Sequence, residues 1–594
     1  MLFGKHINRY YIRHLPRILL GLLALVLVDY MQLIVPNLYK LLINGINEGQ
    51  VVLDGAFIPF NSEFLLDKIC LPMIFILISM LVGRFLWRIC FFGAGIKVET
   101  DLRKRMFDRC KDLSQQYYQV NKVGDLMSLF TNDLETVQDC FGSGILMFCD
   151  ALFLGALAII KMAKMNYLLT LFSMIPMILL LLSGTLVGTY MMKKWEKRQE
   201  AFSALSDFSQ ESFSGISAIK AFVKEYKELL NFRKLNKNNE KANVSYTKIS
   251  TLLNICTTLF VESVICIILG YGSFLVYKGI FSTGELIEFI GYFTTIVWPV
   301  MAVSQLIEMN SRGRASLNRI SQLLDAQIDV KDNENVCDIN EISGDIEFRN
   351  LTFSYPGSNY NALKNVSFKI KAGENVGIIG KTGCGKTTLV DLILRTYNVP
   401  NGTIFLDGND VNTIPIKTVR RFTSYVPQDN FLFSDTIENN ISFCVDDCNE
   451  EEIARVAKLA DVHDNITDFS LGYKTVLGER GVTVSGGQKQ RISIARALMK
   501  NASILILDDS VSAVDVKTEK EILKNLRENR HKKTTILIAH RITTIENMDK
   551  IIFMHDGTVS AVGTHYELYK SNEEYRKMVE LQRLETESEV SENV

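Results

Sequence analysis

Six apolar stretches, each close to the length of a membrane-spanning helix, occupy much of the first half of this 594-residue chain. A helix crosses the hydrocarbon core of a bilayer with about 20 consecutive apolar residues. The stretches that meet this requirement are 18–42, 69–92, 145–160, 167–191, 252–277 and 286–306. The third is short, and Pro299 interrupts the sixth. The first half is therefore expected to be an all-α domain of six transmembrane helices.

Basic residues are concentrated in two of the segments that connect these stretches, the one after the second stretch and the one after the fourth. The first connection is acidic instead, with Glu48, Asp54, Glu63 and Asp67. Because basic loops stay on the cytoplasmic side, we expect a multi-pass protein of the cell membrane with both termini in the cytoplasm. Both basic segments are long and poor in Gly and Pro, which predicts helical extensions into the cytoplasm that turn back near 117–125 and 213–221.

The charged residues almost balance, with 65 Lys and Arg against 66 Asp and Glu and a net charge of −1. Proteins that bind nucleic acids carry a basic surface that neutralises phosphates, so no nucleic-acid partner is expected. The eleven cysteines show no framework spacing, and several lie inside apolar stretches, where they act as small apolar side chains. Reduced, intracellular thiols are the simplest interpretation.

The second half changes to short strands and turns from Gly344 onward. A strand that ends at Gly380 leads into GKTGCGKTT and then into an apolar helical segment, which is the context that makes a GxxxxGK[ST] motif credible. Its glycines let backbone N–H groups close around phosphates at a helix N-terminus. The motif predicts that Lys386 reaches the β- and γ-phosphates of a nucleotide and that Thr387 ligates Mg²⁺.

A second landmark is the apolar run 504–507, which ends in Asp508. A buried parallel strand that presents a carboxylate at its C-terminal end supplies the other half of such a Mg²⁺ site. Alone, this pattern is more often a core strand with a capping aspartate. Downstream of a phosphate-binding loop, it predicts metal coordination by Asp508.

The segment VSGGQ at 484–488, followed by KQRISIARAL, resembles the signature of ABC transporters. Further motifs that look like those of this family are Tyr355 in FSYPG, Gln428 in YVPQD, GERG at 478–481, SAVD at 512–515 and His540 in LIAHR. The resemblance covers about 344–580 and reaches the first half through VGDLMSLFTND and ESFSGISAIKAF. The chain resembles an exporter-type half-transporter, and DDSVSAVD is similar to one subunit of bacterial heterodimeric multidrug exporters.

The resemblance implies a multi-domain fold. The expected parts are an all-α six-helix transmembrane domain with long cytoplasmic helical extensions (1–320), a linker (321–343), an α/β P-loop NTPase domain with an α-helical signature subdomain (344–580) and an acidic tail (581–594). The two cytoplasmic turns are expected to dock on the NTPase domain near Gln428 and 431–433.

The resemblance also implies ATP and Mg²⁺ as cofactors. The metal would be held by Thr387, Gln428 and Asp508, and the catalytic residues would be Asp509, His540 and Gln428. The nucleotide-binding residues that it implies are Tyr355, Gly380, Thr382, Gly383, Cys384, Gly385, Lys386, Thr387, Thr388, Ser485, Gly486, Gly487 and Gln488. In this family the signature of one protomer closes over the nucleotide held by the other, so a second half-transporter is implied as partner.

One position departs from the family pattern. The residue after Asp508 is usually a glutamate that polarises the attacking water, whereas this chain has Asp509. Removing one methylene retracts the carboxylate by about 1.5 Å, and a misplacement of that size can cost ~100-fold in rate. We expect a site that binds ATP and hydrolyses it poorly, in a heterodimer whose partner supplies the competent P-loop and glutamate. Retained activity is the alternative.

The expected function is ATP-driven export of amphipathic small molecules or lipids across the membrane. A homodimeric exporter of lipid or peptide is one alternative. A weakly hydrolysing regulatory or channel-like protein is another, and import by an exporter-shaped protein is a third.

Five ionisable residues fall inside the apolar stretches, where such residues are costly and are candidates for function: Asp29, Arg84, Arg88, Asp150 and Glu262. Internal pairing, for example of Asp29 with Arg84, is one interpretation. The other is a cavity for amphipathic cations with acidic patches and aromatic walls. The aromatic candidates are Phe148, Phe153, Phe260, Tyr271, Phe293 and Trp298.

Overall fold

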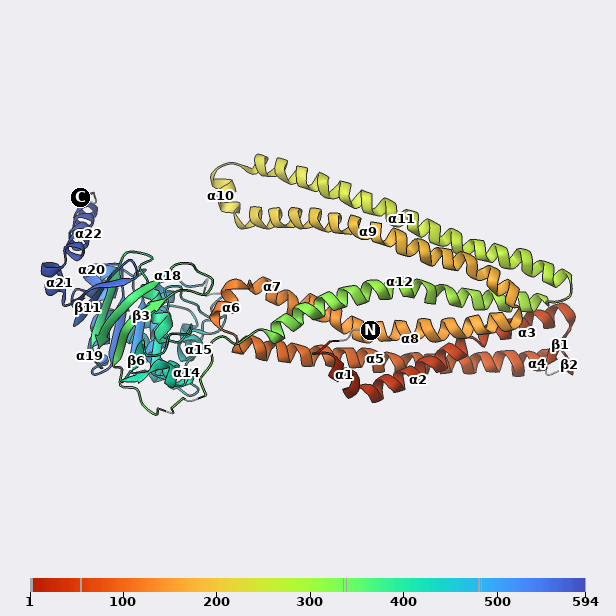
Figure 1. Cartoon of the computed structure of the whole chain (residues 1–594), viewed down its shortest axis with the longest axis horizontal. Coiled ribbons are helices and arrows are strands. Elements are labelled where there is room, and N and C mark those ends of the chain that lie inside the picture. The colour runs from red at the N-terminus through yellow and green to blue at the C-terminus, as the bar shows by residue number, and fades with distance from the viewer. Residues whose placement is uncertain are drawn as a thin grey trace. The chain divides into compact units, whose positions relative to one another are not determined.

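The computed structural model describes residues 4–53, 56–334, 336–337, 339–478, 481 and 483–592. The chain folds into two compact units (Figure 1). The helical unit comprises 1–111 and 123–326, and the sheet unit comprises 112–122 and 327–594. The short segment 112–122 thus belongs to the sheet unit although both of its neighbours in sequence belong to the helical unit.

The helical unit consists of long helices and one small hairpin of strands. Its elements are α1 Asn8–Arg13, α2 Leu15–Gln32, α3 Val35–Glu48, β1 Gln50–Leu53, β2 Ala56–Pro59, α4 Ser62–Phe64, η1 Leu65–Cys70, α5 Leu71–Asp112, α7 Val123–Ser128, η2 Leu129–Asp133, α8 Leu134–Met165, α9 Tyr167–Ser214, α10 Ile216–Ala221, α11 Glu225–Tyr277 and α12 Thr283–Asp325.

Among the described residues, five helical segments are long and apolar enough to cross a membrane: Leu15–Glu48, Ser62–Asp112, Val123–Met165, Glu225–Tyr277 and Thr283–Asp325. The remaining predicted stretch lies in α9, and within the described residues it is represented by the apolar segment Tyr167–Leu180. Pro299 lies inside α12 without ending it. Pro36 lies in the first turn of α3, so the predicted stretch 18–42 is two helices rather than one, because proline is favoured at a helix start and cannot donate a backbone hydrogen bond.

The long helices extend well beyond the length of a bilayer, as predicted. Figure 1 shows α9 and α11 side by side as a hairpin that α10 closes. The 53 residues of α11 would measure about 80 Å along the helix axis. The other reversal passes through α6, Gln115–Val120, and α7. Both reversals therefore fall at the predicted positions 117–125 and 213–221.

The sheet unit is a mixed α/β fold with a helical part, which confirms the predicted fold class. Besides α6, its elements are β3 Ile346–Phe353, β4 Leu363–Ile370, β5 Asn375–Gly380, α13 Lys386–Ile393, β6 Ile404–Leu406, β7 Asn409–Asp410, η3 Val411–Thr413, α14 Ile416–Phe422, β8 Thr423–Val426, α15 Ile437–Ser442, α16 Glu450–Leu459, α17 His463–Thr467, η4 Gly472–Lys474, α18 Gly486–Met499, β9 Ile504–Asp508, α19 Val516–Asn529, β10 Thr534–Ile538, α20 Ile542–Ile545, β11 Lys550–His555, β12 Thr558–Gly563, α21 His565–Ser571 and α22 Glu573–Glu592.

The main sheet places the ends of distant strands at one edge. In the described part of the unit, its six strands run in the order β12-β11-β5-β10-β9-β8, and all neighbours are parallel except β11 and β12. Residues of β9 and β10 are buried throughout, as expected for parallel strands covered on both faces. The carboxyl ends of β5, β9 and β10 therefore lie next to one another, and in open α/β sheets this edge is where ligands bind.

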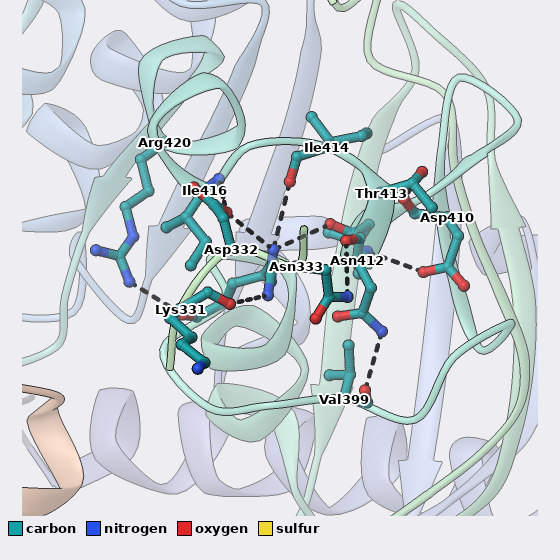
Figure 2. A network of polar contacts seen from close by, with 12 residues as sticks. Lys331, Asp332, Asn333, Val399, Asp410, Asn412, Thr413, Ile414, Ile416 and Arg420 are labelled. Atoms are coloured by element: carbon teal, nitrogen blue, oxygen red, sulfur yellow. Dashed lines mark hydrogen bonds and ion pairs between the residues drawn. The ribbon is translucent and has the colours of Figure 1, made fainter. Parts of the chain in front are cut away.

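The segment before β3 is fastened to the sheet unit by a polar network (Figure 2). Asp332 accepts hydrogen bonds from the backbone N–H of Ile416 at 2.8 Å and from the buried guanidinium of Arg395 at 3.5 Å. Asn333 donates to the carbonyl of Asn412 at 3.2 Å. Residues 331–333, which the sequence places in a linker, are thus held against the unit that follows them.

Candidate functional site

The predicted phosphate-binding loop joins β5 to α13. Gly383 and Gly385 have φ of +83° and +97°, a backbone region that residues with a Cβ rarely adopt. A Cβ on Gly385 would also lie 2.7 Å from the Leu363 side chain. The ammonium group of Lys386 donates to the carbonyls of Gly380 at 2.9 Å and Lys381 at 3.2 Å, so the lysine lies across the concave side of its own loop.

Oxygen ligands for a divalent cation lie beside this loop. Asp508 at the end of β9 is 2% exposed, and within the described residues its Oδ2 has no hydrogen-bond partner. Its carboxyl group contacts the Thr387 hydroxyl, and burial raises the pKa of Asp508. An unpaired buried carboxylate oxygen is costly, and hard cations such as Mg²⁺ prefer oxygen ligands. Asp508 and Thr387 therefore fit the expected Mg²⁺, which would neutralise phosphate charge there.

A cavity of about 500 Å³ opens at this edge of the sheet. The predicted site residues that line it are Tyr355, Thr382, Gly383, Gly385, Lys386, Thr387, Thr388, Gln428, Asp508 and His540. The structure thus brings together residues from five separate sequence motifs. The volume of this cavity is typical of small-molecule sites.

Four lining residues with polar side chains were not predicted from the sequence: Tyr360, Asn361, Lys364 and Asp556. They belong to the segment that leads into β4 and to the turn between β11 and β12, which meet where the backbone N–H of Lys364 donates to the carbonyl of Gly557 at 2.7 Å. No local motif marks them. The Asp556-Gly557 turn is visible in the sequence, but its position beside the phosphate-binding loop is not.

The predicted adenine-stacking residue Tyr355 is held on two sides. Its hydroxyl shares a 2.9 Å hydrogen bond with the Thr388 hydroxyl. Its ring lies edge-to-face against Phe353 and Tyr397, with centroid distances of 5.2 and 5.1 Å. Burial raises the pKa of Tyr355. A ring fixed in this way loses little further entropy when a flat base stacks on it.

Helix α6 contacts the aromatic cluster behind Tyr355. The hydroxyl of Tyr397 donates to Gln119 Oε1 at 2.8 Å, and both residues belong to the sheet unit. The sequence predicts docking near Gln428 and 431–433, whereas Gln119 of α6 contacts Tyr397. Phe431 and Phe433 are 49% and 41% exposed, and docking at these residues stays a prediction.

Two predicted residues of the loop lie beneath it rather than in the cavity. Cys384 is 4% exposed, and a Cβ on Gly380 would lie 2.7 Å from its sulfur. Burial raises the pKa of the Cys384 thiol. Because the thiolate is the reactive form, burial lowers the reactivity of Cys384, and this predicted nucleotide-binding residue packs beneath the loop.

Asp509 differs from its neighbour Asp508 in its backbone conformation and in its position relative to the cavity. Its φ is +47°, in the left-handed region that aspartate tolerates better than most residues. Its backbone N–H donates to the carbonyl of Ile538 at 3.0 Å, and its own carbonyl accepts from the Ser512 hydroxyl at 2.8 Å. Asp509 is not among the described residues that line the cavity.

The signature residues 485–488 lie at the N-terminus of α18. Ser485 caps α18 by accepting from the backbone N–H of Gln488, whose side chain accepts from Ser485 N–H in return, a reciprocal capping box. Ser485 and Gly486 are exposed, and none of the predicted residues 485–488 is among the described lining residues. Of the segment 478–481, Glu479 and Arg480 lie outside the described residues.

The signature helix is tied to the segment SAVD. Gln490 in α18 accepts a hydrogen bond from the backbone N–H of Ala513 at 3.1 Å, and a Cβ on Gly487 would lie 3.0 Å from the Ala513 carbonyl oxygen. Asp515 then caps α19 by accepting from the N–H groups of Lys517 and Thr518. The signature helix and the segment SAVD are therefore in direct contact.

The loop that carries His540 is fastened from the C-terminal helix. Gln582 in α22 donates to the His540 carbonyl at 2.7 Å and accepts from the N–H of Ile542 at 2.8 Å. The nitrogen and the oxygen of the Gln582 side-chain amide thus hold the main chain on either side of Arg541. The sequence gives no signal for this contact.

The ionisable residues of the apolar stretches do not pair as the sequence suggested. Asp29 is 1% exposed, and it adjoins Asp150 rather than forming an ion pair with Arg84. Asp150 accepts a 2.8 Å hydrogen bond from the indole of Trp298. Among the described residues, Asp29 Oδ2 has no hydrogen-bond partner. Glu262 is exposed on α11.

The aromatic candidates separate into two groups. Phe293 is fully buried in the packing between helices, so it is a core residue and not a cavity wall. Phe148 lines a separate cavity of about 310 Å³ between α8 and α12, together with Ile307 and Asn310. Trp298 is 46% exposed.

A membrane-spanning helical unit joined to a P-loop unit whose signature helix begins with exposed residues defines a class of protein, the half-transporter driven by ATP. Family models agree with this class. The model of the ABC transporter transmembrane region matches 18–300, and the ABC transporter model matches 363–512.

Similar proteins match over almost the whole chain. It is 36% identical to the probable multidrug resistance ABC transporter ATP-binding/permease protein YheI of Bacillus subtilis, with 99% of this chain and 98% of that protein covered. It is 34% identical to the multidrug resistance-like ATP-binding protein MdlA of Escherichia coli, with 97% and 96% covered. It is 32% identical to the ATP-dependent lipid A-core flippase of Syntrophus aciditrophicus, with 89% and 88% covered.

A solved structure has the same fold. The structure of a bacterial Atm1-family ABC exporter with ATP bound superimposes with a TM-score of 0.78 at 24% identity, covering 97% of this chain and 99% of that one. The chain belongs to the ABC transporter family as an exporter-type half-transporter. It is a multi-pass membrane protein, and ABC exporters function as dimers that couple ATP hydrolysis to transport.

Proposed function

We propose that this chain is one subunit of a heterodimeric ABC exporter that moves amphipathic small molecules or lipids. In this proposal the chain binds Mg·ATP through Tyr355, the phosphate-binding loop, Gln428 and Asp508, and hydrolyses it poorly. Its signature residues 485–488 complete the nucleotide site of the partner. Both termini and the sheet unit lie in the cytoplasm.

Asp509 is the observation that carries the proposal. A water-polarising carboxylate acts only within hydrogen-bond reach of the water. The side chain of Asp509 is one methylene shorter than the glutamate usual in the family, and Asp509 is not among the described residues that line the cavity. The other cavity residues are those needed for binding, which supports retained nucleotide affinity with slow chemistry.

The exposure of the signature supports action on a partner. The N-terminus of α18 presents free N–H groups and the positive end of the helix dipole, which favours a phosphate. Ser485 and Gly486 are exposed and lie outside the lining of this chain's own cavity. A second half-transporter would supply the phosphate that they contact.

The helical unit supports an amphipathic cargo. The cavity with Phe148 is lined mostly by apolar residues, while Asp150 and Trp298 offer polar groups near Asp29. Relatives are named for multidrug resistance and for lipid flipping, and both kinds of substrate have large apolar surfaces. An ammonium group on the cargo would be attracted by the two aspartates.

The proposal is tested with the chain purified alone. It should bind Mg·ATP and turn it over more slowly than roughly 1 s⁻¹, the lower end of the usual enzyme range, because both sites of a homodimer would carry Asp509. Lys386→Ala should abolish binding and serves as the control. Faster steady hydrolysis by the chain alone would contradict a degenerate site and would favour the homodimeric exporter.

A further inference from the structure

Two aspartates meet inside the helical unit. Asp29 lies on α2 and Asp150 on α8, and their carboxyl groups are within hydrogen-bond reach of each other. Asp29 is 1% exposed within a single protomer, so a second protomer that packs on the surface adds nothing to its surroundings. The environment of Asp29 is therefore set by this chain.

The groups that face the pair compensate at most one of its two charges. On α8, the neighbouring Cys149 is a thiol. On α12, Trp298 donates its indole N–H to Asp150 at 2.8 Å. On α5, Arg84 acts on Asp29 electrostatically from beyond the ion-pair distance of 4.0 Å. Among the described residues, Asp150 and Arg84 are the only charged groups that act on Asp29.

This arrangement does not allow both carboxyl groups to be ionised. Like charges in contact repel strongly in apolar surroundings, and one member of such a pair keeps a proton. Two carboxylates would also lack a donor, since ionised carboxyl oxygens only accept hydrogen bonds. Among the described residues, Asp29 Oδ2 has no hydrogen-bond partner, and an unsatisfied buried oxygen is costly. One proton supplies the missing donor and removes one of the two charges.

The ligands that the pair offers do not suit a metal ion. Hard cations such as Ca²⁺ take about six to eight oxygen ligands. The pair offers only two carboxyl groups, and the Trp298 indole already binds one oxygen of Asp150. Among the described residues, no group of three or more His, Cys, Asp or Glu side chains is placed to hold a metal ion. A proton needs only the two carboxyl groups.

We propose that Asp29 and Asp150 form a proton-binding site, which holds one proton between α2 and α8 at neutral pH. The pair then carries a single negative charge, which Arg84 offsets, and an O–H···O hydrogen bond joins the two helices. A second consequence rests on the proposed function. A cationic cargo beside Asp150 favours the doubly ionised pair, so binding of the cation releases the proton to solvent and leaves the charge of the site unchanged.

Infrared spectroscopy of the full chain in lipid nanodiscs detects the proton directly. A protonated carboxyl group gives a C=O stretching band that an ionised carboxylate lacks, and the difference spectrum between wild type and variant isolates this band. Asp29→Asn should remove one such band per chain at neutral pH, because the asparagine amide supplies a donor to Asp150 without a proton. Asp150→Asn should also remove the band, and it replaces the first variant if Asp29→Asn fails to fold.

Asp133→Asn is the matched control. Asp133 is also buried, but it accepts hydrogen bonds from the Ser316 hydroxyl at 2.6 Å and from Arg319 Nε at 3.0 Å. The arginine keeps this carboxylate ionised, so its removal should leave the band intact. A band that is absent from the wild type, or that survives both Asp29→Asn and Asp150→Asn, would overturn the proton site.

The lipophilic cation tetraphenylphosphonium tests the exchange separately. Its binding to the wild type, measured by equilibrium dialysis, should lower the carboxyl band in proportion to occupancy. A bound cation that leaves the band unchanged would overturn the exchange, but neither the proton site nor the proposed export. Failure of the cation to bind would overturn the exchange together with the cationic cargo, while the band in the absence of the cation still decides the proton site.

Discussion

Asp391 lies on α13, just beyond the phosphate-binding loop and near Asp508. Burial and the charge of Asp508 raise the pKa of Asp391 from 3.8 to about 6. The folded chain therefore holds a proton on Asp391 at pH values where the unfolded chain has lost it. Stability contributed in this way is fully present below pH 4 and is lost as the pH rises through 6.

Asp391→Asn should remove this pH dependence. A shift of about two units corresponds to about 3 kcal/mol, so above pH 6 the variant should melt up to roughly 6 to 10 °C higher in the transition of the sheet unit. Thermal melting of the nucleotide-free protein between pH 4 and 8, with EDTA present, measures the effect. The exposed Asp447→Asn serves as the control, and a gain that does not vary with pH would contradict the assignment.

Cys384 illustrates how burial changes the reading of a single residue. In the sequence it stands inside the phosphate-binding motif, among the residues that the family resemblance assigns to nucleotide binding. In the fold it packs under Gly380, where it acts as a small apolar side chain. The motif gives its place along the loop, but only packing determines which side of the loop it occupies.

At the scale of elements, α22 belongs to the nucleotide site although it follows every recognised motif. Its Gln582 holds the main chain on both sides of Arg541, and His540 lines the cavity. We therefore assign Gln582 as a positioning residue for His540. The same helix includes most of 581–594, which the sequence suggested was only an acidic tail.

Gln582→Ala should speed the release of Mg·ATP by up to about 30-fold, because it removes two hydrogen bonds worth about 1 kcal/mol each from the loop that carries His540. Stopped-flow dissociation of a fluorescent ATP analogue measures this rate. Gln582→Glu keeps the acceptor for Ile542 N–H and should be intermediate, and the exposed Leu581→Ala should have no effect.

A double variant distinguishes a positioning role of Gln582 from a general loss of stability of the sheet unit. If Gln582 acts through His540, then Gln582→Ala combined with His540→Ala should release nucleotide no faster than His540→Ala alone. Additive effects would mean that α22 stabilises the unit without orienting His540.

At the scale of the whole molecule, the proposed heterodimer would divide the nucleotide residues of one chain between two half-sites. The cavity collects the phosphate-binding loop, Asp508 and His540, whereas Ser485 and Gly486 of the signature are exposed and are not among the described residues that line it. Under the proposed heterodimer, Asp509 lies at the site that hydrolyses ATP slowly. Ser485 completes the partner's site, which is the competent one. Changes at the two residues should then have unequal consequences.

Transport and ATPase activity should fall much more for Ser485→Ala or Gly486→Asp than for Asp509→Ala, each measured with a wild-type partner in vesicles. The magnitude expected for removing a phosphate-contacting donor is on the order of 100-fold. Asp509→Glu should preserve or raise hydrolysis at this chain's own site. Equal losses for Asp509→Ala and Ser485→Ala would show that both sites are catalytic and would rule out the proposed asymmetry.

The sequence by itself determined the features that depend on local chemistry. Apolar length predicted the membrane helices, and low Gly and Pro content predicted the extensions of α9 and α11. The glycines around Lys386 predicted the phosphate-binding loop, because a tight turn at a helix N-terminus constrains contiguous residues. Asp508 was found because a buried strand is recognisable as a continuous apolar run.

Only the tertiary structure decided which distant groups meet. It placed Gln582 beside His540, Gln119 beside Tyr397, and Asp29 beside Asp150 rather than in an ion pair with Arg84. It also buried Phe293 between helices. Apolar patterning identifies which elements form, but the partners of a polar side chain depend on how helices and strands pack, and that packing is fixed by many weak contacts between residues far apart in sequence.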